Sequence, residues 1–318
     1  MNTNVLKKYN FLIIGFGGMG CRHAQSLINV YKESVFYIYE PNQSIFENNL
    51  DLISQSSNNM IIKLSKLTDV KLKKIDFCIV ATSSSPRFNI LKELSLYDIS
   101  YFLVEKIVFQ TIKQFEEIKK IFGDKEIYVN FVNRYFLNYI DIKKDINNRS
   151  FTMDIIGGDY GLTCNAIHYF DLFKYFGAKN ISLDNHNLKE NFNLNKRGSE
   201  YKEFLGQISV NSKNGCRLNI SSEKARKGDV EIIIKYSQKT NIINEGSLNH
   251  IKFFENDIIS EPFLIEFTSS LTSKIFSDIL DSNCILPKLE DTIDIHTILF
   301  SSVNKSLKLN PEEICPIT

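Results

Sequence analysis

The glycine-rich stretch after the first apolar run has the spacing of a diphosphate-binding turn. Gly15, Gly17 and Gly20 form a Gly-x-Gly-x-x-Gly pattern directly after residues 11–14, and a helical pattern follows at once. The first glycine permits a tight turn, the second lets backbone approach a diphosphate, and the third lets helix and strand pack closely. The positive end of the helix dipole then favours an anion, although an ordinary strand–helix turn is the alternative. The predicted dinucleotide-binding residues of this turn are Gly15, Phe16, Gly17, Gly18, Met19 and Gly20.

Further polar residues follow later apolar runs and are expected to bind the same cofactor. Glu40 ends the run 35–39, where a carboxylate can accept hydrogen bonds from the adenosine ribose hydroxyls. A carboxylate there also repels a 2′-phosphate, and no basic residue follows directly, so we expect NAD and regard NADP as the alternative. Thr82 ends the apolar run 75–82 and Ser83 begins the polar turn after it, and we expect both residues to complete this part of the cofactor site.

Glu105 and Lys106 follow the buried apolar run 101–104. Ligands of parallel sheets bind outside the carboxyl ends of the strands, so we expect Lys106 to project over the cofactor and Glu105 to lie beside it. Lys106 is also a candidate for substrate binding and catalysis. The alternative is a surface lysine that is paired with Glu105.

A helical segment that begins near Cys164 carries the second catalytic candidate. Cys164, His168 and Asp171 have the spacing i, i+4, i+7 and share one helix face, behind the glycine-rich stretch 157–161. The ordinary pKa of histidine, about 6.5, suits a general base near neutral pH. We expect His168 to be catalytic and Asp171 to orient it or to pack; a packed structural histidine is the alternative. Plausible substrate-binding neighbours are Tyr160, Cys164, Asn165 and Tyr169.

Arg134 follows Asn133 near the expected domain junction, where it either binds substrate or fastens the domains. The other histidines have no partner at a helical spacing and are expected to be structural: His23, His186, His250 and His296. The chain has no Gly-x-Ser-x-Gly and no Gly-Lys-Ser/Thr pattern, which argues against a serine hydrolase and a P-loop NTPase.

Strands that alternate with helices over roughly the first 130 residues predict an α/β domain with a doubly wound parallel sheet. After residue 150 the apolar positions alternate, and Asn214-Gly215 predicts a hairpin. We expect an antiparallel meander in one open sheet, followed by helices near 261–281 and 290–307. The expected domains are 1–123 for the dinucleotide and 124–318 for substrate binding and oligomerisation.

Composition narrows the class of protein. The chain has 318 residues, with 38 Lys and Arg against 37 Asp and Glu, so its net charge of +1 gives no global attraction to nucleic acid or acidic membranes. No apolar run approaches the roughly 18 residues of a spanning helix. The six cysteines are scattered without a Cys-x-x-Cys pair, which argues against disulfides and a zinc site and suits a reducing cytoplasm. We therefore expect a cytoplasmic protein without a metal.

Taken in order, these motifs resemble the Gfo/Idh/MocA oxidoreductases over nearly the whole chain. The matching segments are the glycine turn, Glu105-Lys106, Asn133-Arg134-Tyr135-Phe136, His168-x-x-Asp171 and the final helical stretch 287–302. The resemblance implies a Rossmann domain, a second domain with an open antiparallel sheet, NAD or NADP, sugar or polyol substrates, and dimers or tetramers assembled through that sheet. Two positions depart from the pattern: Cys164 replaces an aspartate and Ile107 replaces a proline.

The expected activity is hydride transfer between NAD and a secondary alcohol or ketone of a sugar or nucleotide sugar. By analogy with the family, we expect this reaction to belong to bacterial surface-glycan synthesis. His168 would take the hydroxyl proton, and Lys106 would stabilise the developing alkoxide. Two alternatives remain: a non-catalytic dinucleotide-binding regulator or scaffold, which the loss of a carboxylate at Cys164 fits, and a glycosidase that uses NAD transiently.

Overall fold

The computed structural model describes residues 7–53, 58–70, 73–191, 198–226, 229–255 and 257–318. The chain forms two compact units. The first unit comprises residues 1–109, 114–132 and 266–290, and the second comprises residues 110–113, 133–265 and 291–318.

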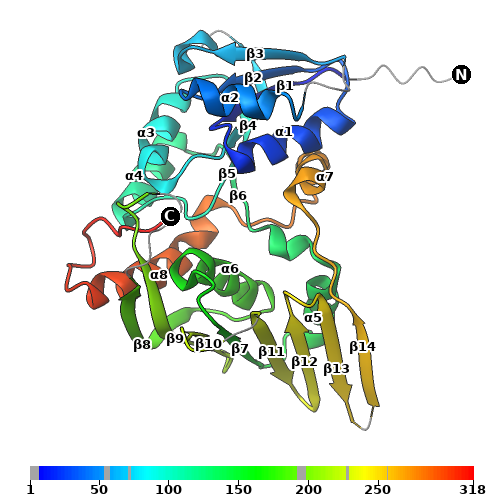
Figure 1. Cartoon of the computed structure of the whole chain (residues 1–318), viewed down its shortest axis with the longest axis vertical. Coiled ribbons are helices and arrows are strands. Elements are labelled where there is room, and N and C mark those ends of the chain that lie inside the picture. Colours follow the sequence, from blue (N-terminus) through cyan, green and yellow to red (C-terminus); the bar gives the residue numbers. More distant parts are fainter. Residues whose placement is uncertain (1–6, 54–57, 71–72, 192–197, 227–228, 256) are drawn as a thin grey trace, which may run out of the picture. The chain divides into compact units, whose positions relative to one another are not determined.

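The first unit contains a parallel six-stranded sheet with the strand order β3-β2-β1-β4-β5-β6 (Figure 1). Every neighbouring pair is parallel. Its central strands are buried apolar runs, because helices cover both faces of a doubly wound sheet. The predicted fold class is therefore confirmed for this unit. Its strands are β1 (Asn10–Ile14), β2 (Val35–Tyr39), β3 (Met60–Leu64), β4 (Ile75–Val80), β5 (Ile99–Val104) and β6 (Ile127–Val129).

Strand β3 was not predicted. It is an edge strand of the sheet, and Met60 is exposed while only Leu64 is buried. An edge strand with Lys63 in its middle lacks the continuous apolar run that marks the central strands. Helical elements of the first unit and its border are α1 (Gly18–Val30), α2 (Gln43–Leu50), the 3₁₀ turn η2 (Leu67–Val70), α3 (Ser84–Leu94), α4 (Ile112–Phe122) and α7 (Thr268–Leu280).

Helix α7 belongs to the first unit, although the expected boundary at residue 123 places it in the second. It packs against α1, and Figure 1 shows the two helices side by side. The Ser26 hydroxyl donates to Ser273 Oγ over 3.1 Å, and the Phe276 ring stacks on Phe77 at 4.8 Å between centroids. The first unit also extends to residue 132, because β6 pairs with β5. Packing across the sequence, which no local pattern encodes, sets both differences.

The second unit contains an eight-stranded sheet with the strand order β14-β13-β12-β11-β7-β10-β9-β8 (Figure 1). Helix α6 packs against β9 and β10, and α8 packs against β8 and α6. Its strands are β7 (Thr152–Gly157), β8 (Ile181–Asn191), β9 (Glu203–Ser212), β10 (Arg217–Ser222), β11 (Glu231–Tyr236), β12 (Lys239–Asn244), β13 (Asn249–Phe254) and β14 (Asp257–Pro262). Helical elements of this unit and its border are η3 (Val132–Tyr135), α5 (Leu137–Ile146), α6 (Leu162–Tyr175), η4 (Leu289–Thr292) and α8 (Ile293–Ser306).

The predicted open, mostly antiparallel sheet is confirmed, and so is the hairpin at Asn214-Gly215 between β9 and β10. The predicted simple meander is wrong, because β7 inserts between β11 and β10 and runs parallel to β10. The helix expected from residue 261 is also wrong at its start. Residues 257–262 form strand β14, which pairs with β13, and α7 begins only at Thr268.

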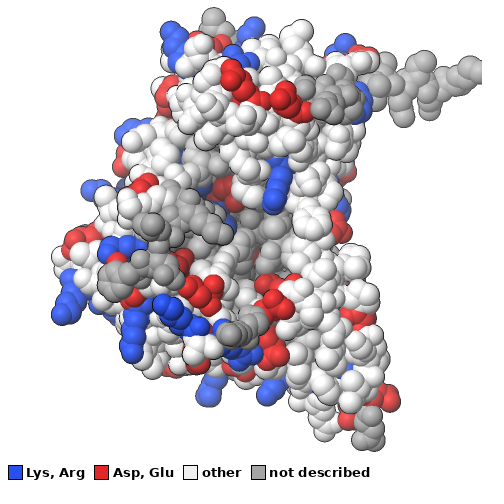
Figure 2. All heavy atoms as spheres, viewed as in Figure 1, with Lys and Arg blue, Asp and Glu red and all other residues white. Residues whose placement is uncertain are grey.

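Basic and acidic side chains are intermixed on the face of the molecule in Figure 2, in line with the near-zero net charge. Within the described ranges, no helix combines the length and the apolar character needed to cross a membrane.

Candidate functional site

The glycine turn of the first unit is shaped by two positions that exclude a side chain. Gly15 has φ +82°, and its N–H donates to the Tyr39 carbonyl over 2.9 Å. A Cβ at Gly20 would lie 1.9 Å from the Gly15 carbonyl oxygen, so only glycine fits where α1 crosses β1. At Gly17 and Gly18, by contrast, a Cβ would meet nothing within 4 Å. The turn therefore leaves open space before the helix.

Helix α1 begins beside that space without a side-chain cap. Gly17 occupies the N-cap position, no side chain accepts a hydrogen bond there, and the first turn holds no acidic residue. The first helical N–H groups have no intrahelical partner, so a negatively charged group satisfies them best. The turn fits the diphosphate of a dinucleotide.

Glu40 ties the glycine turn to the end of β2. Its carboxylate is only 9% exposed; Oε2 accepts the Phe16 N–H over 2.8 Å and Oε1 accepts the Asn42 N–H over 3.0 Å. A carboxylate has about four lone-pair sites, so each oxygen can still accept a ribose hydroxyl. Glu40 can thus serve the turn and a nucleotide together.

Lys106 is 9% exposed, so the alternative of a surface lysine is wrong. Its neighbour Glu105 is 8% exposed, and Oε1 contacts His23 Nε2 at 3.1 Å and Asn130 Nδ2 at 2.5 Å. Burial raises the pKa of Glu105, but the hydrogen bonds and charge of His23, together with Asn130 and Lys106, outweigh it and lower the pKa to about 2. Glu105 is therefore a carboxylate at neutral pH.

His23 and Arg87 position the end of β5, and sequence reasoning missed both roles. His23 is fully buried on α1, between Glu105 and the Thr272 hydroxyl, which lies 2.8 Å from Nδ1. Arg87, 1% exposed on α3, donates to the carbonyls of Glu105, at 2.6 Å, and of Ile107. The Lys106–Ile107 peptide bond that these contacts flank is cis. No helical spacing links these partners, so a local pattern cannot reveal them.

Thr82 and Ser83 lie at the end of β4 beside the glycine turn. A Cβ at Gly15 would lie 3.1 Å from the Thr82 backbone nitrogen, and the Thr82 carbonyl accepts a hydrogen bond from Arg87. The first unit thus brings together the glycine turn and the ends of β4 and β5, as the sequence predicts for the cofactor site.

The second unit holds a cavity of about 370 Å³ at the start of α6. Gly161, with φ +75°, precedes the helix, and the Asn165 amide donates to the Tyr160 carbonyl over 2.7 Å. The polar lining residues are Asn133, Tyr160, Asn165, His168, Tyr169 and Glu245, and Phe136, Val230 and Ile265 supply apolar surface. The cavity therefore brings together four predicted residues: Tyr160, Asn165, His168 and Tyr169.

Arg134 and Cys164, which were also predicted to bind substrate, do not line this cavity. Arg134 instead forms a two-pronged ion pair with Asp171: Nε donates to Oδ2 over 2.8 Å and Nη2 to Oδ1 over 2.7 Å. Asp171 is buried, and burial raises its pKa although Arg134 opposes that change. Both carboxylate oxygens thus bind Arg134, and the pair holds α6 against the segment before α5.

Glu245 is a cavity residue that the sequence did not reveal. It follows β12, and Tyr169 donates a hydrogen bond to Oε2 over 3.1 Å. Burial raises the pKa of Glu245, and the hydrogen bond from Tyr169 opposes this. Because Glu245 is far from His168 in sequence, only the folding of the sheet brings them to one cavity. Among the described residues, no group of three or more His, Cys, Asp or Glu is placed to hold a metal.

Known structures share this two-unit fold at low sequence identity. UDP-N-acetylglucosamine 3-dehydrogenase from Acidithiobacillus ferrooxidans matches at a TM-score of 0.72 and 11% identity, over 93% of this chain and 97% of that chain. The WlbA dehydrogenase from Bordetella pertussis, in complex with NADH and UDP-GlcNAcA, matches at 0.69 and 14%, over 95% and 96%. A super-repressor mutant of Gal80p from Saccharomyces cerevisiae matches at 0.72 and 13%, over 98% and 100%.

This chain has their fold. The similarity covers both units, so the fold implied by the resemblance to Gfo/Idh/MocA oxidoreductases is confirmed. No family model matches the chain, and no curated protein matches it in sequence.

Proposed function

We propose that the chain is an NAD-dependent oxidoreductase that acts on a secondary alcohol or ketone of a sugar or nucleotide sugar. The observation that carries this proposal is the uncapped glycine turn, which excludes a side chain at Gly20 and is tied to the Glu40 carboxylate. The fold similarity to a sugar-nucleotide dehydrogenase and to a dehydrogenase in complex with NADH supports it. Bacterial surface-glycan synthesis remains an analogy based on these similar structures.

In this proposal the first unit binds the cofactor. The N–H groups at the start of α1 bind the diphosphate, and Glu40 accepts the ribose hydroxyls, which favours NAD over NADP. The bound nicotinamide supplies a hydride acceptor, or a donor when it is reduced. Arg87 holds the backbone on either side of Lys106 by donating to the Glu105 and Ile107 carbonyls.

Two residues do the remaining chemistry. His168 takes the hydroxyl proton at a ring nitrogen during oxidation and returns it during reduction. The Lys106 ammonium stabilises negative charge that develops on the substrate oxygen. Tyr160 and Asn165 donate hydrogen bonds to sugar hydroxyls from the cavity around His168. On the basis of the family resemblance, we also propose that the chain forms a homodimer or homotetramer. We propose that it works in a reducing cytoplasm, because all six cysteines are free thiols.

The test is steady-state turnover with NAD and a panel of sugars and nucleotide sugars. Lys106→Met and His168→Ala are each expected to lower kcat on the order of 100-fold while NADH affinity stays unchanged. Lys92→Met, which removes one partner of an exposed ion pair, and His186→Ala are the matched controls. Wild-type turnover in both catalytic variants would refute the assignment.

The runner-up function is a non-catalytic dinucleotide-binding regulator. Cys164 stands where the family carries an aspartate, and a repressor variant shares the fold. Tight binding of NADH, with no change in nicotinamide absorbance for any sugar offered, would favour this alternative. Release of free sugar from a glycoside would instead indicate the glycosidase.

A further inference from the structure

Glu245 brings a carboxylate to the cavity around His168. Among the described residues that line this cavity there is no other Asp or Glu and no Lys or Arg. The Glu245 N–H donates to the Val230 carbonyl over 3.1 Å, which fixes the backbone after β12 beside the apolar part of the lining. The carboxylate therefore lies in a cavity whose other polar groups are neutral amides, phenols and one imidazole.

Within the described ranges, the hydrogen-bond partner of this carboxylate is the Tyr169 hydroxyl and not a cation. Tyr169 donates to Oε2 over 3.1 Å, and its ring packs edge-on against Tyr160 at 6.4 Å between centroids. Burial, followed by the charge of Glu245, raises the pKa of Tyr169 well above its usual value, so Tyr169 is a donor at neutral pH. A phenol hydrogen bond satisfies only part of this half-buried carboxylate, because a carboxylate has about four lone-pair sites.

Tyr160 adds a second, independent sign of a ligand. Its hydroxyl is buried and has no hydrogen-bond partner within the described part of the chain, although the residue lines the same cavity. Buried polar groups are nearly always satisfied, so an orphaned hydroxyl at a cavity wall marks a place for a ligand or water. A carboxylate that can accept further hydrogen bonds and a phenol that can donate or accept one thus line the same cavity.

We propose that Glu245 is a substrate-recognition residue that selects a neutral or amino-substituted sugar ring and rejects a ring that carries a carboxylate. Ring hydroxyls or an ammonium group donate to Glu245, and the Tyr160 hydroxyl binds a further ring oxygen. At Glu245 a uronate meets a like charge, and the described residues that line this cavity include no cation beside Glu245 to offset it; such repulsion is strong away from bulk water. This proposal rests on the proposed sugar substrate.

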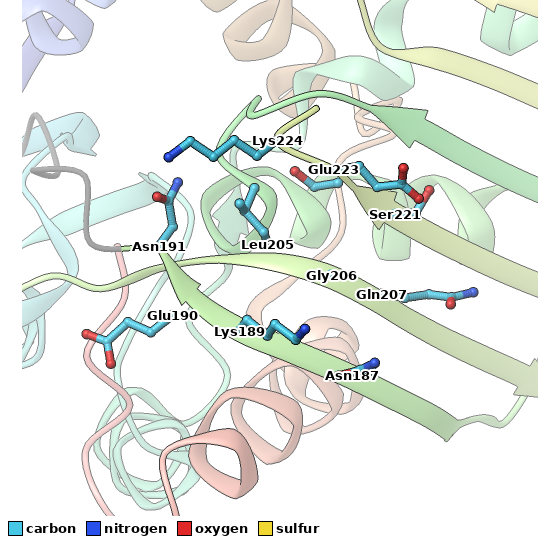
Figure 3. A pocket seen from close by; sticks show the side chains of 11 residues that line it. Asn187, Lys189, Glu190, Asn191, Leu205, Gly206, Gln207, Ser221, Glu223 and Lys224 are labelled. Carbon is cyan, nitrogen blue, oxygen red and sulfur yellow. The ribbon is translucent and has the colours of Figure 1, made fainter. Parts of the chain in front are cut away.

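A larger cavity in the second unit sets the competing outcome. Its volume is about 650 Å³ and it lies between the ends of β8, β9 and β10. Figure 3 shows the side chains of Lys189, Glu190 and Lys224 among its lining residues. Its lining carries the two lysines Lys189 and Lys224 beside the two carboxylates Glu190 and Glu223, so a uronate bound there would meet cations that can offset the repulsion.

The experiment measures the affinities of glucose, glucosamine and glucuronate for the full chain saturated with NADH, by titration calorimetry. Wild type is expected to bind glucuronate at least about tenfold more weakly than glucosamine, and Glu245→Gln to reduce that ratio to about threefold or less. Glu190→Gln, in the larger cavity, is the matched control and is expected to leave the ratio unchanged.

Three results would overturn the proposal: equal binding of the three sugars to wild type, an unchanged ratio in Glu245→Gln, or a ratio that moves only in Glu190→Gln. The proposal would also be overturned if the wild-type chain bound none of the three sugars. NADH affinity, measured in the same samples, reports on the first unit alone. If the wild-type chain does not bind NADH, the proposed function is rejected, and this result is distinct from a failed test of Glu245.

Discussion

The network around Glu105 makes the acid stability of the first unit depend on one buried carboxylate. Glu105 contacts His23 Nε2 and Asn130 Nδ2, and Thr272 lies on the other side of the His23 ring. The change to test is Glu105→Gln, which keeps the shape of the side chain and an accepting oxygen but removes the charge. The substitution also removes the carboxylate partner of His23, which is fully buried.

The magnitude follows from the pKa of Glu105, which is about 2 in the folded chain against an ordinary value of 4.5. A tenfold change in proton affinity corresponds to about 1.4 kcal/mol, so the carboxylate contributes on the order of 3 kcal/mol at neutral pH. The folded pKa is the lower one. This contribution is therefore present above the unfolded pKa and is lost as the pH falls from about 5 to about 2.

The assay is urea unfolding of wild type and Glu105→Gln at pH 7 and at pH 3, followed by circular dichroism and tyrosine fluorescence, since the chain has no tryptophan. We expect Glu105→Gln to be less stable by about 3 kcal/mol at pH 7 and by only about 1 kcal/mol at pH 3. Glu117→Gln, from an exposed ion pair with Lys92, is the control and is expected to change stability by less than about 1 kcal/mol at both pH values.

A constant difference between wild type and Glu105→Gln from pH 7 to pH 3 would refute this reasoning. It would mean that the Glu105 carboxyl has the same proton affinity in the folded and unfolded chain. The comparison uses differences between variants, so it does not require the two units to unfold as one.

Two further predictions concern the glycine turn and the α6 ion pair. Gly20→Ala places a Cβ 1.9 Å from the Gly15 carbonyl oxygen and is expected to destabilise the first unit by about 3 kcal/mol in urea unfolding. Gly17→Ala, where a Cβ meets nothing, should keep that stability but weaken NADH binding at least about tenfold in a fluorescence titration; equal stability of the two variants would contradict the packing argument. Arg134→Met leaves Asp171 buried without its partner and should lower the free energy of unfolding by about 3 kcal/mol. Arg149→Met, from an exposed ion pair, should lower it by less than about 1 kcal/mol. Similar losses of stability in the two variants would show that the Arg134 pair does not hold α6.

The sequence by itself determined the features that depend on neighbouring residues. The positions of Gly15 and Gly20 fix the turn after β1, because one requires a positive φ and the other a missing Cβ. Continuous apolar runs at β1 and β4 predict strands buried on both faces, and Asn214-Gly215 predicts the hairpin between β9 and β10. These features depend on neighbouring residues, so they can be predicted without knowledge of the rest of the fold.

Only the tertiary structure decided which distant residues meet. Both carboxylate oxygens of Asp171 accept hydrogen bonds from Arg134. The helical spacing had instead suggested that Asp171 orients His168. Helix α7 joins the first unit through contacts with α1, and β7 inserts between β10 and β11. Glu245, which follows β12, lines the cavity that His168 lines from helix α6. Periodicity tells which face of an element is apolar, but the partner of a buried charge depends on packing between elements far apart in the chain.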